Sequence, residues 1–157
     1  MGEHVLTRKQ SINLRIEKTF EFFADAANLE KITPPELQFN IITPQPIMIE
    51  KGTFIDYTLK LRGFPVKWRT EISQWEPPFS FIDRALKSPY SQWIHLHKFE
   101  SNAEGGTDMV DEVRYRLPFE PFGDLFHWYV KRELDYIFDY RRDTVASLLN
   151  NDLKAPV

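Results

Sequence analysis

The chain has 157 residues, 42% hydrophobic and 27% charged, which is typical of one soluble globular domain spanning residues 1–157. Its formal net charge of −3 gives no overall attraction for phosphate groups, so nucleic acid is not an expected partner. The absence of cysteine excludes disulfides, thiolate nucleophiles and sulfur-ligated zinc. Because the sequence has neither a signal-peptide pattern nor a run of about 20 apolar residues, we expect a cytoplasmic protein without an integral membrane segment.

The first part of the chain predicts one strand and two short helices. Residues 5–14 alternate loosely between apolar and polar side chains, as a strand does. In residues 16–27 the apolar side chains recur at helical spacings, which predicts a short amphipathic helix. A second short helix is predicted over residues 28–32. It ends at Pro34 and Pro35, because proline lacks an amide hydrogen and restricts the residue before it.

The remainder predicts a sheet followed by a long helix. Six segments of period two, each closed by turn-forming residues, span residues 38–43, 53–61, 66–75, 79–86, 90–101 and 107–117. Their short connections favour an antiparallel meander. From Pro121 to about Asn150, apolar residues at helical spacing predict a helix, with Arg141 as the one polar member of its apolar stripe. A sheet and a helix that bury their apolar faces against each other make an α+β domain.

Several strings in this order of elements are typical of one superfamily. They are Phe22-Phe23-Ala24-Asp25-Ala26-Ala27-Asn28-Leu29, Ile32-Thr33-Pro34-Pro35, Trp75-Glu76-Pro77-Pro78, Trp93 with His95, His97 and Phe99, and Asp111-Glu112-Val113-Arg114-Tyr115 leading to Pro118-Phe119. Over nearly its whole length the chain resembles the bacterial ligand-binding branch of the SRPBCC superfamily, the START-like or polyketide cyclase/dehydrase-like helix-grip proteins. The resemblance implies a curved antiparallel sheet of about seven strands wrapped around the C-terminal helix, with a hydrophobic cavity between them.

Strand parity predicts which side chains face that helix, because residues two apart in a strand share a face. The inner face then carries polar groups among large aromatic ones, namely Tyr57, Thr70, Asp83, His95, His97, Asp111 and Tyr115. Turns at residues 102–106 and 87–89 would place His97 opposite Asp111 and Asp83 opposite His95. The sequence therefore predicts two carboxylates and two imidazoles together on one concave face.

Three interpretations of this polar group are open. The histidines neutralise buried carboxylates and serve only the structure. Alternatively, the polar groups orient the polar head of a ligand in a mostly apolar pocket. In the third interpretation an Asp-oriented histidine performs acid/base catalysis, and the candidate catalytic residues are His95, His97, Asp83 and Asp111.

Neither a metal nor a cofactor is expected. His95-x-His97 resembles the ligand pair of a cupin, but Glu100 has the opposite strand parity and should point away from the imidazoles, leaving Asp111 as a substitute carboxylate ligand. The sequence has no Gly-x-Gly-x-x-Gly, Walker or Gly-x-Ser-x-Gly pattern. The mixed charges of residues 131–143, Arg141 among them, indicate a solvated helix face.

We therefore expect the protein to bind a hydrophobic or aromatic small molecule, lipid-, polyketide- or quinone-like, between the sheet and the C-terminal helix. Residues 29–37 would gate the entrance. The alternatives are a cyclase or dehydratase with an Asp-oriented His as general base, and an interaction module without a physiological ligand. Oligomeric state and ligand identity do not follow from the sequence. The predicted ligand-binding residues are Tyr57, Trp68, Thr70, Phe81, Trp93, His95, His97, Asp111, Tyr115, Phe126, Val130, Leu134 and Phe138.

Overall fold

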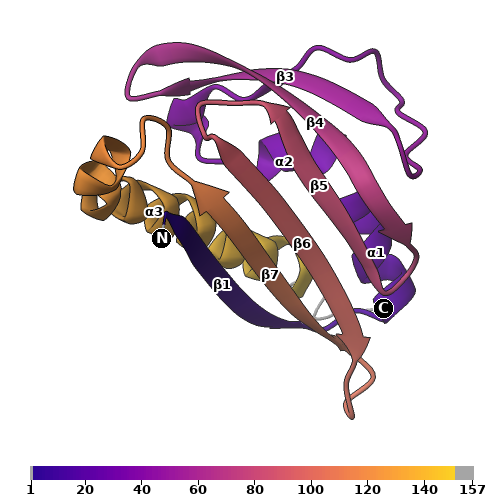
Figure 1. Ribbon diagram of the computed structural model, residues 1–157. Helices are drawn as coiled ribbons and strands as arrows, with labels where there is room; N and C mark the ends of the chain where they lie inside the picture. Colours follow the sequence, from indigo (N-terminus) through magenta and orange to yellow (C-terminus); the bar gives the residue numbers. More distant parts are fainter. Residues whose placement is uncertain (1, 151–157) are drawn as a thin grey trace.

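A seven-stranded antiparallel sheet is the largest part of the fold (Figure 1), and the computed structural model describes residues 2–150 of the protein. The strand order is β1-β7-β6-β5-β4-β3-β2, so the strands after β1 form the predicted meander and β1 pairs with β7 at the other edge. The strands are β1 (Glu3–Ile12), β2 (Asn40–Ile41), β3 (Phe54–Leu61), β4 (Phe64–Glu76), β5 (Ser80–Lys87), β6 (Gln92–Ser101) and β7 (Thr107–Arg116).

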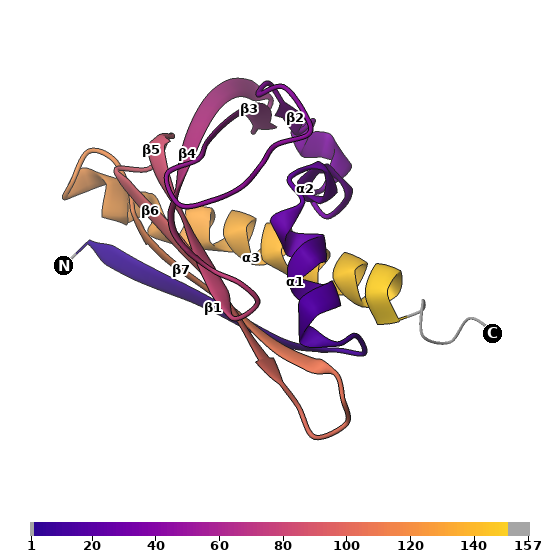
Figure 2. The same ribbon diagram turned by 90° about the vertical axis from the view of Figure 1, so that its right-hand side faces the viewer.

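The sheet curves around the long helix α3 (His127–Val145), while α1 (Ile16–Ala24) and α2 (Ala27–Lys31) lie on the same side of the sheet (Figure 2). Short helical turns flank these helices: η1 (Pro35–Leu37), η2 (Phe122–Phe126) and the π-helical η3 (Ala146–Asn150). This arrangement confirms the predicted α+β helix-grip fold. Within residues 2–150, no helix is both long enough and apolar enough to span a membrane.

Several predicted elements differ from the observed ones. The first helix ends at Ala24 instead of residue 27, and α3 ends at Val145 with the π-helical η3 after it. The strand predicted over residues 38–43 is reduced to the two residues of β2, which lie at the sheet edge shortly before Pro44 and Pro46. Proline has no amide hydrogen to donate to a strand ladder, so the pairing does not extend. The predicted C-terminal helix is preceded by the 3-10 turn η2, and α3 itself begins only at His127.

The predicted strand faces and register are confirmed. On β6, Trp93, His95, His97 and Phe99 are all buried, and the side chains between them are more exposed. In the sheet, His97 lies opposite Asp111 and His95 lies opposite Asp83. The two turns of the meander therefore set the register that brings the four polar side chains to neighbouring positions.

The buried polar side chains lie between two hydrophobic clusters. The first cluster includes Trp93 of β6 together with Leu134 and Phe138 of α3. The second includes Phe99 of β6 together with Phe20 of α1. Because His95 and His97 are the inward-facing residues between Trp93 and Phe99, apolar packing encloses them at both ends of the strand.

We predict that Phe99→Ala lowers the free energy of unfolding by about 3–5 kcal/mol, the cost of emptying a packed aromatic site. Phe99 is only 3% exposed and its ring lies 5.5 Å from that of Phe20. Phe79 is 61% exposed, so the control Phe79→Ala should change stability by less than about 0.5 kcal/mol. Urea unfolding of both variants measures the difference. Equal losses would contradict the assignment of the core.

Candidate functional site

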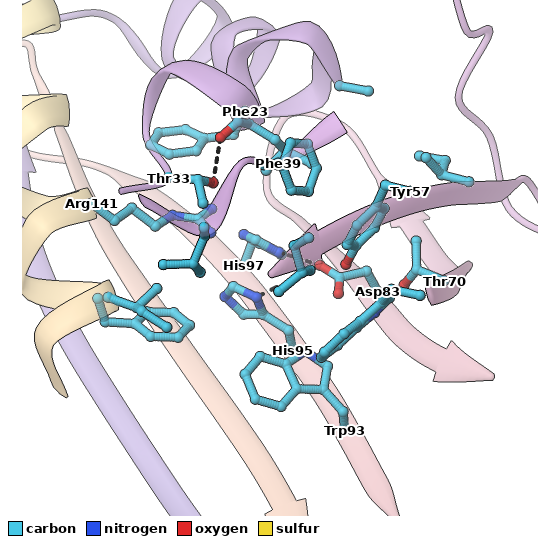
Figure 3. A pocket seen from close by; sticks show the side chains of 18 of the residues that line it. Phe23, Thr33, Phe39, Tyr57, Thr70, Asp83, Trp93, His95, His97 and Arg141 are labelled. Atoms are coloured by element: carbon cyan, nitrogen blue, oxygen red, sulfur yellow. Dashed lines mark hydrogen bonds and ion pairs between the residues drawn. The ribbon is translucent and has the colours of Figure 1, made fainter. Parts of the chain in front are cut away.

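A pocket of about 150 Å³ lies on the concave side of the sheet, lined by residues of β3–β6, the α1–η1 region and α3. Most of its wall is apolar, with Leu59 and Ile72 from the sheet and Ile137 from α3. Polar side chains from the sheet and from α3 point toward one part of it (Figure 3). The polar side chains that line the pocket are Thr33, Tyr57, Thr70, Asp83, Tyr90, His95, His97 and Arg141.

Most of the predicted ligand-binding residues line this pocket, namely Tyr57, Trp68, Thr70, Phe81, Trp93, His95, His97, Leu134 and Phe138, and Asp83 joins them. Asp111 does not line the pocket, but its carboxylate contacts His95 from the neighbouring strand. Tyr115 and Val130 belong to the adjacent hydrophobic cluster. Sequence reasoning left out further lining residues, namely Phe23, Phe39, Tyr90, Ile137 and Arg141.

Phe126 was predicted to bind the ligand, but it does not line this pocket. It is 64% exposed and lines, with Val130, a separate depression where β7 joins α3. The prediction extended the period of the long helix back to residue 126, but this residue lies in the 3-10 turn η2. A 3-10 turn has three residues per turn, so the phase of the helical stripe is not preserved across it.

The segment predicted to gate the entrance forms part of the pocket wall. Leu29, Thr33 and Leu37 line the pocket. Thr33 Oγ1 donates a hydrogen bond to the carbonyl oxygen of Leu29 at 2.6 Å, and the hydroxyl of Tyr136 on α3 donates to the carboxylate of Glu36. These contacts tie the segment to itself and to α3, and its gating role stays a prediction.

The two imidazoles and two carboxylates form one network whose hydrogen bonds run diagonally across the strands. His97 Nε2 donates to Asp83 Oδ2 at 2.7 Å, and His95 Nε2 donates to Asp111 Oδ1 at 2.8 Å. The directly opposite pairs are at longer ion-pair distances, 3.7 Å from His95 Nδ1 to Asp83 Oδ2 and 3.3 Å from His97 Nδ1 to Asp111 Oδ1. The predicted register is confirmed, but each histidine donates its hydrogen bond to the carboxylate that lies opposite the other histidine.

The network keeps both carboxylates ionised. Burial raises the pKa of Asp83, but the charge that His95 carries once it is protonated at low pH and the hydrogen bond from His97 outweigh it, so this pKa lies below its usual value. Burial also opposes ionisation of Asp111. The charge of Arg141 and the hydrogen bond from His95 prevail and hold the pKa of Asp111 well below its ordinary range.

The two imidazoles differ in charge. Burial and the neighbouring charge of His97 lower the pKa of His95. At His97 burial acts in the same direction, but the carboxylates of Asp111 and Asp83 outweigh it and raise its pKa. At a pH between these two pKa values, His97 is the charged ring and His95 is the neutral one. Because His95 Nε2 carries the hydrogen that it donates to Asp111, His95 Nδ1 is a free acceptor.

The same donors fit a transition metal. One ligand atom each from Asp83, His95 and His97 lie within 4.8 Å of one another, and two imidazoles with one carboxylate are a set that iron, manganese and zinc use. Asp111 would then orient His95 through the ring nitrogen that faces away from the metal. A metal would have to replace the hydrogen bond between His97 and Asp83. It would also bind in a pocket that Arg141 lines.

Arg141 corrects the prediction that residues 131–143 form a solvated face. Its side chain lines the pocket, and its Nε and Nη2 atoms are buried. The useful signal was the other observation from the sequence, that Arg141 continues the apolar stripe of the helix after Leu134 and Phe138. Position in the stripe, rather than the charges of its neighbours along the chain, determines which way this residue points.

Comparison with known proteins gives the fold. No family model and no curated protein matches the sequence. The structure is similar to the Zhui aromatase/cyclase from Streptomyces sp. R1128, with a TM-score of 0.77, 11% identity and coverage of 98% of this chain and 97% of that one. It is also similar to TTHA0849 from Thermus thermophilus, with a TM-score of 0.70, 15% identity and coverage of 92% of this chain and 98% of that one.

A third similar structure is the major latex-like protein 151 from Panax ginseng, with a TM-score of 0.65, 14% identity and coverage of 94% of this chain and 98% of that one. All three likenesses extend over nearly the full length of both chains. At these identities they show a shared fold, and they confirm the helix-grip architecture that the SRPBCC resemblance implied.

We predict that stability is highest near pH 6.5, the ordinary histidine pKa of the unfolded chain. The raised pKa of His97 contributes stability that is present below about pH 6.5 and is lost as the pH rises through its folded pKa. The lowered pKa of His95 costs stability as the pH falls from about 6.5 through its folded pKa.

Urea unfolding at a series of pH values measures both effects. His97→Gln should reduce the decline in the free energy of unfolding above pH 6.5, and His95→Gln should reduce the decline in the same quantity below pH 6.5. Because the pKa of His127 is also lowered, by burial and by the charge of His4, part of the acid-side decline should persist in His95→Gln. A wild-type stability that keeps rising above about pH 7 would contradict the charged state assigned to His97.

Proposed function

We propose that the protein binds a hydrophobic or aromatic small molecule in the pocket between its sheet and α3. The observation that carries this proposal is the pocket itself, an apolar cavity in which a few polar groups converge on one region. Pockets of this composition use their apolar wall for affinity and their polar groups for orientation. Trp68 and Trp93 meet edge to face in this wall, with ring centroids 5.3 Å apart, and offer a rigid aromatic surface.

The size of the pocket limits what it encloses. An apolar cavity of about 150 Å³ is known to hold a benzene-sized molecule, and the pocket here has about that volume. It therefore encloses one aromatic ring or a short aliphatic chain, and a larger ligand would extend toward the segment around Leu37. An interaction module without a ligand would be expected to fill this space with side chains, so the open pocket favours ligand binding.

Acid/base catalysis is the second candidate, and the hydrogen bond between His95 and Asp111 is the observation that favours it. A neutral imidazole whose Nε2 is fixed by Asp111 can present Nδ1 as a general base, which suits the proton transfers of a cyclase or dehydratase. One protein of similar fold is an aromatase/cyclase. A His95→Ala variant that still binds ligand but loses turnover would distinguish catalysis from binding alone.

Titration with N-phenyl-1-naphthylamine, a neutral dye that fluoresces in apolar sites, tests the binding proposal. The dye has three aromatic rings, so we expect one ring to be enclosed and the remainder to extend past Leu37, with saturable binding of one dye per chain. Leu37→Trp replaces a leucine of the pocket wall by a bulky indole ring, which should reduce the space for the dye. We expect a loss of about 1–3 kcal/mol of binding free energy by overpacking, which is about 5- to 150-fold in affinity.

The matched control is Leu125→Trp, because Leu125 is exposed and does not line this pocket. It should leave the dye affinity unchanged. Absence of saturable binding to the wild type, or an equal loss in both variants, would overturn the proposal.

A further inference from the structure

The guanidinium of Arg141 is charged and incompletely paired. Its Nε and Nη2 atoms are buried and have no hydrogen-bond partner among residues 2–150. An arginine side chain keeps its charge at any physiological pH, and a buried charged donor without an acceptor is costly. Elsewhere in the protein, Arg8 satisfies its guanidinium with Asp135 and Asp139, at 2.8 and 2.9 Å. Arg141 thus lacks the carboxylate partner that other arginines of this chain have.

The two unpaired nitrogens form the edge of the guanidinium that binds a carboxylate side-on. Arg69 shows this geometry in the same protein, where its Nε donates to Asp56 Oδ1 at 2.8 Å and its Nη2 donates to Asp56 Oδ2 at 3.1 Å. Two parallel donors at this spacing match the two oxygens of a carboxylate. The same pair of atoms is free in Arg141.

Two aromatic rings lie close to the guanidinium of Arg141. Its central carbon lies 5.8 Å from the ring centroid of Phe23 on α1 and 5.9 Å from that of Phe138 on α3, within cation–π range. Figure 3 shows the side chain extending from α3 into the pocket toward the imidazoles. These contacts orient a flexible side chain before any ligand arrives, which reduces the entropy that binding must cost.

The buried carboxylates of Asp83 and Asp111 do not fill this edge. Asp83 accepts the hydrogen bond of His97, and Asp111 accepts that of His95. Arg141 influences both carboxyl groups through its charge, lowering the pKa of each, without a hydrogen bond to either. The acceptor that would complete the guanidinium must therefore come from outside these residues.

We propose that Arg141 binds the carboxylate of the ligand, so that the pocket accepts hydrophobic or aromatic carboxylic acids in preference to their neutral counterparts. The inference rests on the proposed function of the pocket as a binding site, and it adds the chemical class of the ligand. The carboxylate lies at the Nε and Nη2 edge, and the ring or short chain occupies the apolar part of the pocket beside Trp68 and Trp93.

Displacement of N-phenyl-1-naphthylamine by 3-phenylpropanoate and by 3-phenylpropanamide tests the inference. These two compounds share one ring and one short chain and differ in charge. We expect the wild-type protein to bind the acid about 10- to 150-fold more tightly than the amide, the range for hydrogen bonds to a charged group. Arg141→Met should abolish this preference while leaving the affinity for the neutral dye within about threefold of wild type.

Arg142→Met is the matched control. Arg142 is the next residue of α3, is exposed and forms ion pairs with Asp139 and Asp143. It should keep the full preference for the acid. If Arg141→Met fails to fold, Arg141→Gln replaces it, with the same expected loss of preference.

The possible failures are distinguishable. If the dye does not bind to the wild type, the proposed function of the pocket fails. If the dye binds but the acid and the amide compete equally, the pocket is a binding site and the role of Arg141 is refuted. A preference for the acid that survives both Arg141→Met and Arg141→Gln would also refute it.

Discussion

The structure depends on two carboxylates that the fold buries beside its helix. Asp83 and Asp111 lie on the concave face of the sheet, where an unpaired carboxylate would be costly. Two imidazoles on the strand between them, from His95 and His97, supply the hydrogen bonds that make this burial possible. The pocket can therefore be largely apolar and still contain charged groups, because these groups are paired with one another before a ligand arrives.

That pairing follows from the register of the sheet. The interior strand β6 has β5 on one side and β7 on the other, so its inward-facing histidines reach a carboxylate on each side. A slip of one residue would turn the whole set to the convex face. Arg141 approaches from the helix opposite and adds a charge that the sheet does not neutralise by contact. The sheet thus holds a polar network in which His97 Nδ1 lacks a hydrogen bond within the described part of the chain, and the helix presents two further open donors on Arg141.

Sequence reasoning reached the sheet order, the inward faces and the register because each depends on local patterns. Alternation sets the face of His95 and His97, and the turn residues around Gly105 set their partners. The features that the sequence did not predict depend on how side chains from different strands and helices contact one another. Parity does not reveal that the hydrogen bonds run diagonally, and the mixed charges near Arg141 obscured its position in the apolar stripe. The predicted placement of Phe126 in the pocket was wrong for a related reason, because a 3-10 turn interrupts the helical period at this residue.

The central claim is that the two stacked imidazoles, 3.7 Å apart between ring centroids, hold one charge that resides on His97. Long-range ¹H–¹⁵N NMR of the imidazole nitrogens at pH 6.5 tests it most directly, with His95→Gln and His97→Gln for assignment. We predict that both nitrogens of His97 are protonated and that His95 is neutral, with its hydrogen on Nε2. Two neutral rings, or a charged His95 beside a neutral His97, would contradict the account.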